Sequence, residues 1–563
     1  MAATAFAVLL YLGRNGTFYH DEWTFIGQRG GTLTDWFGPH NEHWSTVPFF
    51  VYRVLLLTVG LTSYLPYLAV LLALHLVAAG SLFGLIRQAC GALVALAAAA
   101  IFLFMGSGEQ NLFWAFQIGF VGSAAGGFGA LLAMSKGHPR IAMPLLVMAI
   151  ASSSMGLPFV AVAAAMLLLD PARRRQIVWL VPVAVVFLAW FALIGQSGVA
   201  GHAANVAPEA LARLPAFVAF GVADSIDAAF GLVAPLGALL GLLTIGWAVR
   251  GVRDRSLLVL AVGAGLGVVV LFVLIGLGRG QFGVEQANRS RYIYFGVGWV
   301  LLAICAVFGR NAEDAVRHFA GSGRLTRPGA LAGVLVVGLA ANAIVANAAR
   351  LPDSAAVFAE AGGELRAFVG LAARYGPALP YRPPPVTRIY IPSPAILGGY
   401  LREYGNPVRD ALVPSVARSP TPLERDRALW DLTGGWVAAQ PVASPAPSTG
   451  SPPLVDGLAQ ARLSVSAGCL VVESVAGSAG SVTLSVADGS SVLASVAQGG
   501  GGAVRLGRDA PPDPFDERGV TFPPGGWLRF EVPPLGDGSV FGLQFVLPAG
   551  SSARLCRPEA PQP

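Results

Sequence analysis

The chain has 563 residues, of which 55% are hydrophobic and only 12% are charged. This composition excludes an ordinary soluble protein and predicts a polytopic membrane protein. The formal net charge of +6 does not indicate nucleic-acid binding, because the arginines are scattered among short loops rather than gathered on one face.

The first apolar run, Ala2–Leu12, is shorter than the roughly 20 residues of a membrane-spanning helix. It lacks both a basic start and a small-residue cleavage site, so we do not expect a signal peptide. We expect this run to belong to the first helix of a membrane domain, and we expect the natural start of that helix to lie further upstream.

Two groups of polar and aromatic side chains follow in the first loop, His20-Asp21-Glu22-Trp23 and His40-Asn41-Glu42-His43-Trp44. Acidic residues beside hydrocarbon are costly and usually serve a function. Asp21 or Glu22 is therefore a candidate general base. The ordinary alternative is that Asp21 caps a helix.

Other side chains of this loop are candidates for binding sugar or acceptor: His20, Trp23, Glu42 and His43. Trp23, Trp36 and Trp44 are predicted either to stack on sugar rings or to anchor the loop at the membrane interface. His20 and Glu42 carry imidazole and carboxylate groups that divalent metals accept as ligands. Their spacing matches no metal motif, so we predict no metal site and keep a divalent metal as the alternative.

Ten further apolar runs follow: Tyr64–Ile86, Gly91–Met105, Phe113–Met134, Ile141–Ala151, Leu157–Leu169, Ile177–Ile194, Gly231–Val249, Leu257–Leu277, Tyr292–Phe308 and Ala330–Ala348. The stretch from Ile141 to Leu169 is either one long helix or two short helices that turn at Ser152–Ser154. The run Val47–Val59 either spans the membrane or lies on its surface.

The positions of the basic residues favour one of these arrangements. They mark five loops, at Arg87, at Lys136 and Arg140, at Arg173–Arg175, at Arg250–Arg255, and at Arg310–Arg327. The positive-inside rule requires all five in the cytoplasm. They share one side only if Ile141–Leu169 is a hairpin and Val47–Val59 does not span. This topology predicts about eleven spans, with the N-terminus inside and everything after Arg350 outside.

The same topology brings most polar motifs of the membrane half to the outer face. One of them, at the start of a helix, contains Glu109, Trp114 and Gln117, of which the last two are predicted to share a helix face and to contact sugar or acceptor. Ordinary capping and packing explain Trp114 and Gln117 equally well.

Another motif carries Arg279, Arg289, Arg291 and Tyr292. Arginine suits phosphate because its planar fork donates two parallel hydrogen bonds, whereas an arginine at a helix end can also reach lipid headgroups.

Composition changes after Arg350, where proline becomes frequent. We predict a transmembrane domain at 1–349 and an extracytoplasmic segment at 350–439 with short helices at Glu364–Ala373 and Ala395–Tyr404. A flexible linker at 440–453 then leads to a β-sandwich of jelly-roll type at 454–563. Cys469 lies on an early strand and Cys556 on the last, so a disulfide between them is expected outside the cytoplasm.

An acidic pair after helix one, surface helices in the first outer loop, about eleven spans and a soluble outer domain together resemble the GT-C superfamily of membrane glycosyltransferases. The chain also resembles actinobacterial membrane proteins that share its His-Asp-Glu-Trp, Asn-Glu-His and Trp-x-x-Gln elements. The resemblance implies a polyprenyl-phosphate sugar donor, an acceptor in the cell envelope, and a catalytic carboxylate at Asp21 or Glu22. The β-sandwich is similar to the carbohydrate-binding-like modules of arabinofuranosyltransferases.

The leading hypothesis is therefore an inverting glycosyltransferase in the plasma membrane, acting at its outer face on a cell-envelope glycan, glycolipid or protein. A transporter or flippase of a lipid-linked glycan is the second hypothesis. Transporters usually hold ionisable residues near the middle of the membrane and have repeated halves, and neither is evident in this sequence. The third hypothesis is a non-catalytic scaffold that binds envelope glycan, for which eleven helices are excessive.

Overall fold

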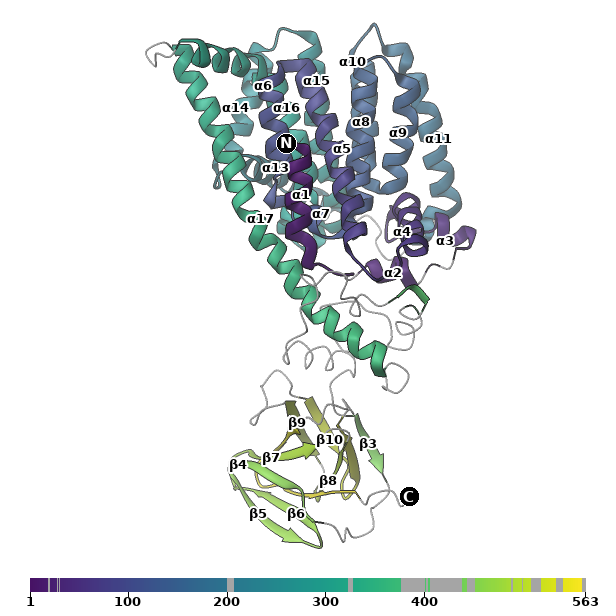
Figure 1. Ribbon diagram of the computed structural model, residues 1–563, viewed down its shortest axis with the longest axis vertical. Helices are drawn as coiled ribbons and strands as arrows, with labels where there is room; N and C mark the ends of the chain where they lie inside the picture. The colour runs from purple at the N-terminus through teal and green to yellow at the C-terminus, as the bar shows by residue number, and fades with distance from the viewer. Residues whose placement is uncertain are drawn as a thin grey trace. The chain divides into compact units, whose positions relative to one another are not determined.

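The structure is a computed structural model that describes residues 1–18, 21–27, 29, 31–199, 207–322, 328–375, 400, 403–405, 438–442, 451–487, 490–498, 500–507, 518–532 and 540–558. The chain divides into two compact units, Met1–Gly362 and Gly363–Pro563, which we call the helical unit and the C-terminal unit (Figure 1). His20 and most of the helix predicted at Ala395–Tyr404 lie outside the described residues.

The helices follow in the order α1 (Ala2–Leu12), α2 (Glu22–Gly27), α3 (Leu33–Phe37), α4 (Thr46–Thr58), α5 (Leu65–Cys90), α6 (Ala92–Leu103), α7 (Gln110–Phe113), α8 (Ile118–Ser135), α9 (Pro139–Ser152), α10 (Leu157–Leu169), α11 (Val181–Trp190), α12 (Gln196–Val199), α13 (Pro208–Phe230), α14 (Leu236–Gly251), α15 (Arg255–Arg279), α16 (Ser290–Ser322) and α17 (Pro328–Tyr375). Proline stands in the first turn of α5, α9, α10, α11 and α13. Its missing N–H costs nothing there, because the first helical N–H groups have no partner within the helix.

Among the described residues, six helical segments are long and apolar enough to cross a membrane: Leu65–Cys90, Ala115–Ser135, Arg174–Gly195, Arg255–Phe282, Ser290–Arg317 and Leu331–Ala359. The other predicted spans correspond to α1, α6, α9, α10 and α14, which have between 11 and 16 residues. Eleven helices thus stand where spans were predicted, and six of them reach spanning length.

The stretch from Ile141 to Leu169 forms two helices, as the hairpin alternative requires. Helix α9 ends at Ser152, Ser153 is extended, and α10 starts at Leu157. Gly156 makes this turn tight, because a Cβ atom there would lie only 2.5 Å from the Ala149 carbonyl carbon.

Arginine side chains join the loops at one end of the helical unit. Arg173 Nη1 donates to the Met134 carbonyl at 2.9 Å, and Arg255 Nη2 donates to the Leu169 carbonyl at 3.3 Å. Arg310 donates to the Ala89 carbonyl at 3.1 Å and to the Asp254 carboxylate at 2.7 Å.

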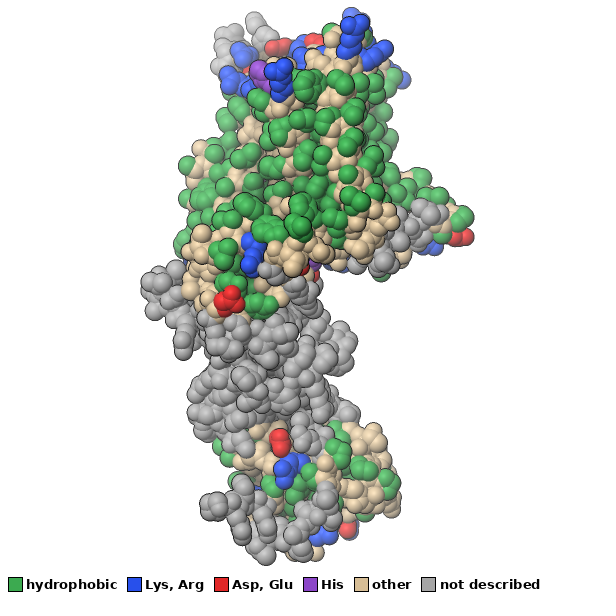
Figure 2. Space-filling model, turned by 90° about the vertical axis from the view of Figure 1, so that its right-hand side faces the viewer, with side chains coloured by type: hydrophobic (Ala, Val, Ile, Leu, Met, Phe, Trp, Pro, Cys, Tyr) green, Lys and Arg blue, Asp and Glu red, His purple; other side chains and the backbone are tan. Residues whose placement is uncertain are grey.

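These bonds connect all five loops that the basic residues mark in the sequence, so the loops share one end, as predicted. Figure 2 shows lysine and arginine side chains gathered at one end of the helical unit, beyond a broad hydrophobic surface. We call this end the basic end. The opposite end, which α15 reaches at Arg279, is called the polar end.

Helix α4 lies at the polar end together with α2 and α3 (Figure 1). It has 13 residues, too few to span a membrane. The segment between the predicted spans Ile177–Ile194 and Gly231–Val249 contains the 23-residue helix α13, which no predicted span covers. Helix α13 packs closely on its neighbours, since a Cβ atom at Gly221 would lie 2.4 Å from the Phe272 ring.

The predicted domain boundary at residue 349 falls inside helix α17, which continues to Tyr375 through the helix predicted at Glu364–Ala373.

The strands of the C-terminal unit are β3 (Ala438–Val442), β4 (Leu454–Ala459), β5 (Ala461–Ser466), β6 (Cys469–Ser474), β7 (Gly480–Ala487), β8 (Ser491–Val496), β9 (Gly500–Gly507), β10 (Arg518–Phe522), β11 (Trp527–Glu531), β12 (Val540–Leu547) and β13 (Ser552–Cys556).

These strands form two antiparallel sheets, in the orders β10-β9-β12-β7-β4 and β3-β11-β8-β13-β6-β5. Buried side chains from both sheets, such as Phe545 and Phe530, share one hydrophobic core. The C-terminal unit is therefore a β-sandwich, while the strand order alone does not make it a jelly roll.

Strand β3 begins before the predicted sandwich and includes residues 440–442 of the predicted linker. Its pairing with β11 outweighs the linker-like composition, and Pro441 is tolerated because β3 is an edge strand.

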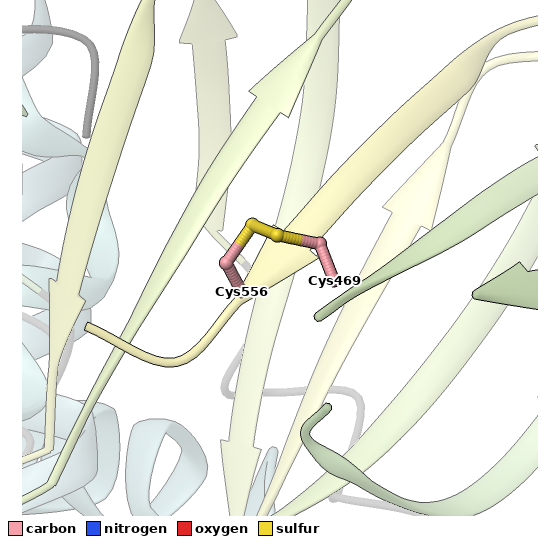
Figure 3. Close-up of a disulfide and its surroundings, with 2 residues drawn as sticks. All are labelled: Cys469 and Cys556. Atoms are coloured by element: carbon pink, nitrogen blue, oxygen red, sulfur yellow. A yellow bond between two sulfur atoms is a disulfide. The ribbon is translucent and has the colours of Figure 1, made fainter. Parts of the chain in front are cut away.

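Cys469 and Cys556 form a disulfide with an S–S distance of 2.03 Å, the pairing expected from the sequence (Figure 3). Strands β6 and β13 pair with Leu470 opposite Leu555, so the two cysteines face each other one residue further along. Their Cα atoms are 4.4 Å apart, which is typical of directly opposed residues that share no backbone hydrogen bonds. Cys90 and Cys305 are buried and unpaired in the helical unit.

Candidate functional site

Asp21 and Glu22 are adjacent in the chain but lie in opposite environments. The Glu22 side chain is fully buried, whereas 28% of the Asp21 side-chain surface is exposed. The Asp21 carboxylate is therefore accessible to solvent, while the Glu22 carboxylate is not.

The Glu22 carboxylate is held by two tyrosines, Tyr52 of α4 and Tyr64 just before α5. Tyr52 donates to Oε1 at 2.5 Å, and Tyr64 donates to Oε2 at 3.4 Å. The Tyr64 oxygen in turn accepts a hydrogen bond from the Ala115 N–H at 2.7 Å. Burial is the main reason why the pKa values of both tyrosines lie well above 10, so both hydroxyls stay protonated as donors. These bonds fix α2, and with it the backbone that carries Asp21.

A short hairpin presents the second polar group of the first loop. It consists of β1 (Pro39–His40) and β2 (His43–Trp44), and it turns at Asn41, which has a φ of 52°. Asparagine is one of the few residue types that adopt this left-handed conformation readily. His40 Nε2 lies 3.9 Å from the Asp21 carboxylate, too far for a hydrogen bond. The hairpin thus sets an imidazole beside the exposed carboxylate.

Glu42 and His43 connect this hairpin to distant parts of the chain. Arg279 Nη2, at the end of α15, donates to Glu42 Oε1 at 2.9 Å. His43 Nδ1 lies 2.5 Å from Ser154 Oγ, in the turn between α9 and α10. Burial lowers the pKa of His43 to about 4, and Arg279 and Arg291 add to this decrease. His43 is therefore neutral at physiological pH.

Two arginines of this region have donors that no described residue satisfies. The Nε–H groups of Arg279 and Arg291 are buried and lack an acceptor among the described residues. The Arg291 guanidinium lies 5.1 Å from the centre of the Tyr292 ring. We call Asp21, His40, Glu42, His43, Arg279 and Arg291 the loop cluster. Unsatisfied buried donors are rare in proteins, so these two groups are candidates for contact with a ligand or with water.

Arg289 and Glu109 belong to a separate cavity at the polar end. Its volume is about 530 Å³, and its charged lining consists of Glu109, Asp224, Asp227, Glu285, Arg289 and Arg350. Burial raises the pKa of Glu109. The arginines predicted to act together thus divide, since Arg289 lines this cavity while Arg279 and Arg291 lie near His43. We call this space the acid-lined cavity.

Four aromatic or amide side chains considered for sugar binding are buried. Trp23 is completely buried beside Phe18, and Trp44 is stacked on Trp190 with ring centres 4.9 Å apart. Trp114 and Gln117 are at most 6% exposed. None of these four side chains offers a surface on which a sugar ring could stack, so they act in packing.

Trp114 and Gln117 do not share a helix face, contrary to the prediction. Helix α7 ends at Phe113, Trp114 has an extended backbone, and a 3₁₀ turn at Ala115–Gln117 precedes α8. The spacing of three residues predicts a shared face only on a continuous helix, and this helix is interrupted.

The described residues contain no group of three or more His, Cys, Asp or Glu side chains arranged to hold a metal ion. Glu42 instead pairs with Arg279, whose positive charge opposes a cation at that carboxylate. The proposed ligand His20 lies outside the described residues.

Sequence reasoning missed four charged residues of the acid-lined cavity: Asp224, Asp227, Glu285 and Arg350. The available signal was the pair Asp224 and Asp227, three residues apart in an otherwise apolar segment. No apolar run predicted from the sequence covers this segment, so the pair had no predicted helix face on which to lie together.

No protein-family model matches the chain, and no curated protein matches it. Among solved structures, arabinosyltransferase EmbB from Mycobacterium smegmatis, determined by single-particle cryo-EM, is similar to the chain, with a TM-score of 0.38 and 12% sequence identity. The similarity covers 99% of this chain but only 64% of that enzyme's chain. A likeness of this degree assigns neither a family nor an activity, so any functional conclusion has to come from the residues at the polar end.

Proposed function

We propose that the protein is a membrane glycosyltransferase of the GT-C type. It transfers a sugar from a polyprenyl-phosphate donor to a cell-envelope acceptor at the outer face of the plasma membrane, with inversion of configuration. One observation carries this proposal. A partly exposed carboxylate, Asp21, belongs to the same cluster as two arginines whose buried Nε–H groups lack an acceptor among the described residues.

The two arginines support a phosphate ligand. A guanidinium N–H that is buried without a partner loses its hydration and gains no bond in return. A phosphate oxygen satisfies it with a charge-assisted hydrogen bond. Arg279 and Arg291 are therefore proposed to hold the leaving phosphate, and Tyr292 supports the Arg291 guanidinium from one side.

Arg289 is a weaker candidate for this role. It lines the acid-lined cavity together with four carboxyl groups, which disfavour an anion. We assign the donor phosphate to Arg279 and Arg291, and this assignment narrows the set predicted from the sequence.

Asp21 is the proposed general base. Its carboxylate takes the proton of the acceptor hydroxyl, whose oxygen forms a bond to the anomeric carbon as the bond from that carbon to the phosphate oxygen breaks. The polyprenyl phosphate leaves with the electron pair of that bond. Attack opposite the phosphate inverts the anomeric configuration. Glu22 is too buried to take part directly and is proposed to hold Asp21 in position.

A lipid-linked donor fits the surroundings of the loop cluster. The part of the helical unit that the structure describes has six helical segments long and apolar enough to cross a membrane. The positive-inside rule assigns the basic end to the cytoplasm, and the polar end then faces outward. The polyprenyl tail would remain in the bilayer while its phosphate reaches Arg279 and Arg291.

The test is transfer by the full-length protein in nanodiscs from synthetic polyprenyl-phosphate sugars to a mixture of envelope glycan fragments. We expect a glycoside whose anomeric configuration is opposite to that of the donor, as read by NMR. A folded protein that transfers no sugar from any donor in the panel would overturn the proposal. Movement of the intact donor across a bilayer in the same preparation would then favour the transporter.

A further inference from the structure

The acid-lined cavity has a composition that neither a phosphate nor a metal ion explains. Its charged lining includes four carboxyl groups and two guanidinium groups, from Arg289 and Arg350. The excess of carboxyl groups repels anions. The two guanidinium groups oppose a bare cation, and the described residues contain no metal-binding group of three. An apolar ligand is equally unsuited, because most of the lining is polar.

Hydroxyl groups match this mixed lining, since each one both donates and accepts a hydrogen bond. Carboxylates such as Asp224 accept from a hydroxyl, while Arg350 donates to its oxygen. A second observation points to a ligand in the same space. Gln110 lines the cavity, and its side-chain oxygen is buried and accepts no hydrogen bond from the described residues.

The cavity is built by the fold rather than by one loop. Asp224 and Asp227 come from α13, Glu109 and Gln110 from the segment that begins α7, and Arg350 from α17. Asp227 is tied down by the Gly237 N–H, which donates to its Oδ1 at 2.7 Å. Helix α13 is itself fixed against α15 by the close contact of Gly221 with Phe272. The polar lining is therefore held in place before any ligand arrives.

We propose that the acid-lined cavity binds an uncharged sugar residue of the acceptor glycan, with Asp224, Gln110 and Arg350 as its main hydrogen-bonding partners. The assignment to the acceptor rests on the proposed function, whereas the binding of a neutral saccharide does not. Its volume of about 530 Å³ leaves room for a sugar ring and part of its neighbour.

The experiment measures binding without any donor. Neutral methyl glycosides, both furanosides and pyranosides, are titrated onto the full-length protein in nanodiscs by saturation-transfer NMR. We expect at least one glycoside to bind. Asp224→Asn and Gln110→Met should weaken its binding about tenfold or more, because each removes an acceptor of hydroxyl hydrogen bonds. Asp314→Asn, an exposed change at the basic end, serves as the matched control and should bind like the wild type.

Three results would overturn the inference. The first is that no glycoside of the panel binds to the folded protein. The second is wild-type affinity in both Asp224→Asn and Gln110→Met. The third is complete displacement of the bound glycoside by inorganic phosphate, which would make the cavity an anion site.

Failure of the proposed function gives a different pattern. If the inference is correct, glycoside binding persists in Asp21→Asn and in a protein that transfers nothing. If only the inference is wrong, sugar transfer continues in the wild type while the acid-lined cavity binds no glycoside.

Discussion

The two ends of the helical unit use arginine in different ways. At the basic end, Arg173, Arg255 and Arg310 donate to carbonyls at the ends of α8, α10 and α5. At the polar end, Arg279 and Arg291 each retain a buried Nε–H without an acceptor among the described residues. The hydrogen-bond partners of an arginine, and not its position in the sequence, therefore distinguish an arginine that caps a helix from one that can bind a ligand.

Helix dipoles sharpen this difference. The arginines of the basic end meet the last turns of helices, where carbonyls lack partners and positive charge is favourable. Arg291 stands in the first turn of α16, where the dipole disfavours a cation. A residue that is electrostatically costly in the unliganded protein is better explained by an anionic ligand than by capping.

The largest expected effect concerns the carboxylates at the two ends. Asp21→Asn keeps the shape of the side chain but cannot accept a proton, so turnover should decrease ~10²–10⁴-fold while donor binding is nearly unchanged. Asp314→Asn, at the basic end, should retain full turnover. Single-turnover transfer from a polyprenyl-phosphate sugar measures both variants. Wild-type turnover in Asp21→Asn would remove Asp21 from the mechanism and make Glu42 the next candidate.

An intermediate effect is expected for the buried carboxylate beside Asp21. Glu22→Ala leaves the hydroxyls of Tyr52 and Tyr64 without their acceptor, which should lower the free energy of unfolding by about 1–3 kcal/mol. Tyr52→Phe removes one donor and should cost less. Thermal unfolding in detergent measures both variants. Unchanged stability together with lost turnover in Glu22→Ala would contradict a positioning role and point to direct catalysis.

The smallest effect is a difference between the two ends of the helical unit in how their stability depends on pH. Folded His43 gains a proton only near pH 4, whereas the unfolded imidazole gains it near pH 6.5. The stability of the polar end should therefore decrease as the pH falls from 6.5 to 4.

Asp254, at the basic end, loses its charge in a lower pH range. Hydrogen bonds from Ser256, together with those from Arg310 and Leu257, lower its pKa to about 2. The contribution of the Asp254 carboxylate to stability is fully present above pH 3.8 and is lost as the pH falls through 2. Hydrogen exchange of each end across this pH range tests the difference, with His43→Gln as the matched variant. The same slope between pH 6.5 and 4 in His43→Gln would show that another group causes it.

Much of the helical arrangement could be predicted, because apolar runs form helices in the hydrocarbon and basic loops stay on the cytoplasmic side. The shared end of the five basic loops and the turn at Ser153 both follow from counting arginines. Helix α13 was missed because Asp224, Asp227 and Pro215 interrupt its hydrophobic pattern. Its many alanines favour a helix, so the missed signal was local helix propensity rather than hydropathy.

The candidate site was predictable only in part. The sequence identified Asp21, Glu22, Arg289 and Arg291 as candidates by chemistry. Neighbouring residues then separated in space, since Glu22 is buried while Asp21 is partly exposed, and Arg289 lines the acid-lined cavity whereas Arg291 does not. Side-chain direction at the end of a helix changes with each residue, so no spacing rule could divide these pairs.

The most direct test of the account is the retention of polyprenyl phosphate by the protein in nanodiscs, measured by native mass spectrometry. The double variant Arg279→Met/Arg291→Met should bind this lipid about 10–100-fold more weakly than the wild type, because charge-assisted hydrogen bonds to phosphate are lost. Arg173→Met/Arg310→Met, which removes the same charge from the basic end, should retain the lipid. Equal retention by the two double variants, or loss only in the second, would contradict the claim that the polar end binds the donor phosphate.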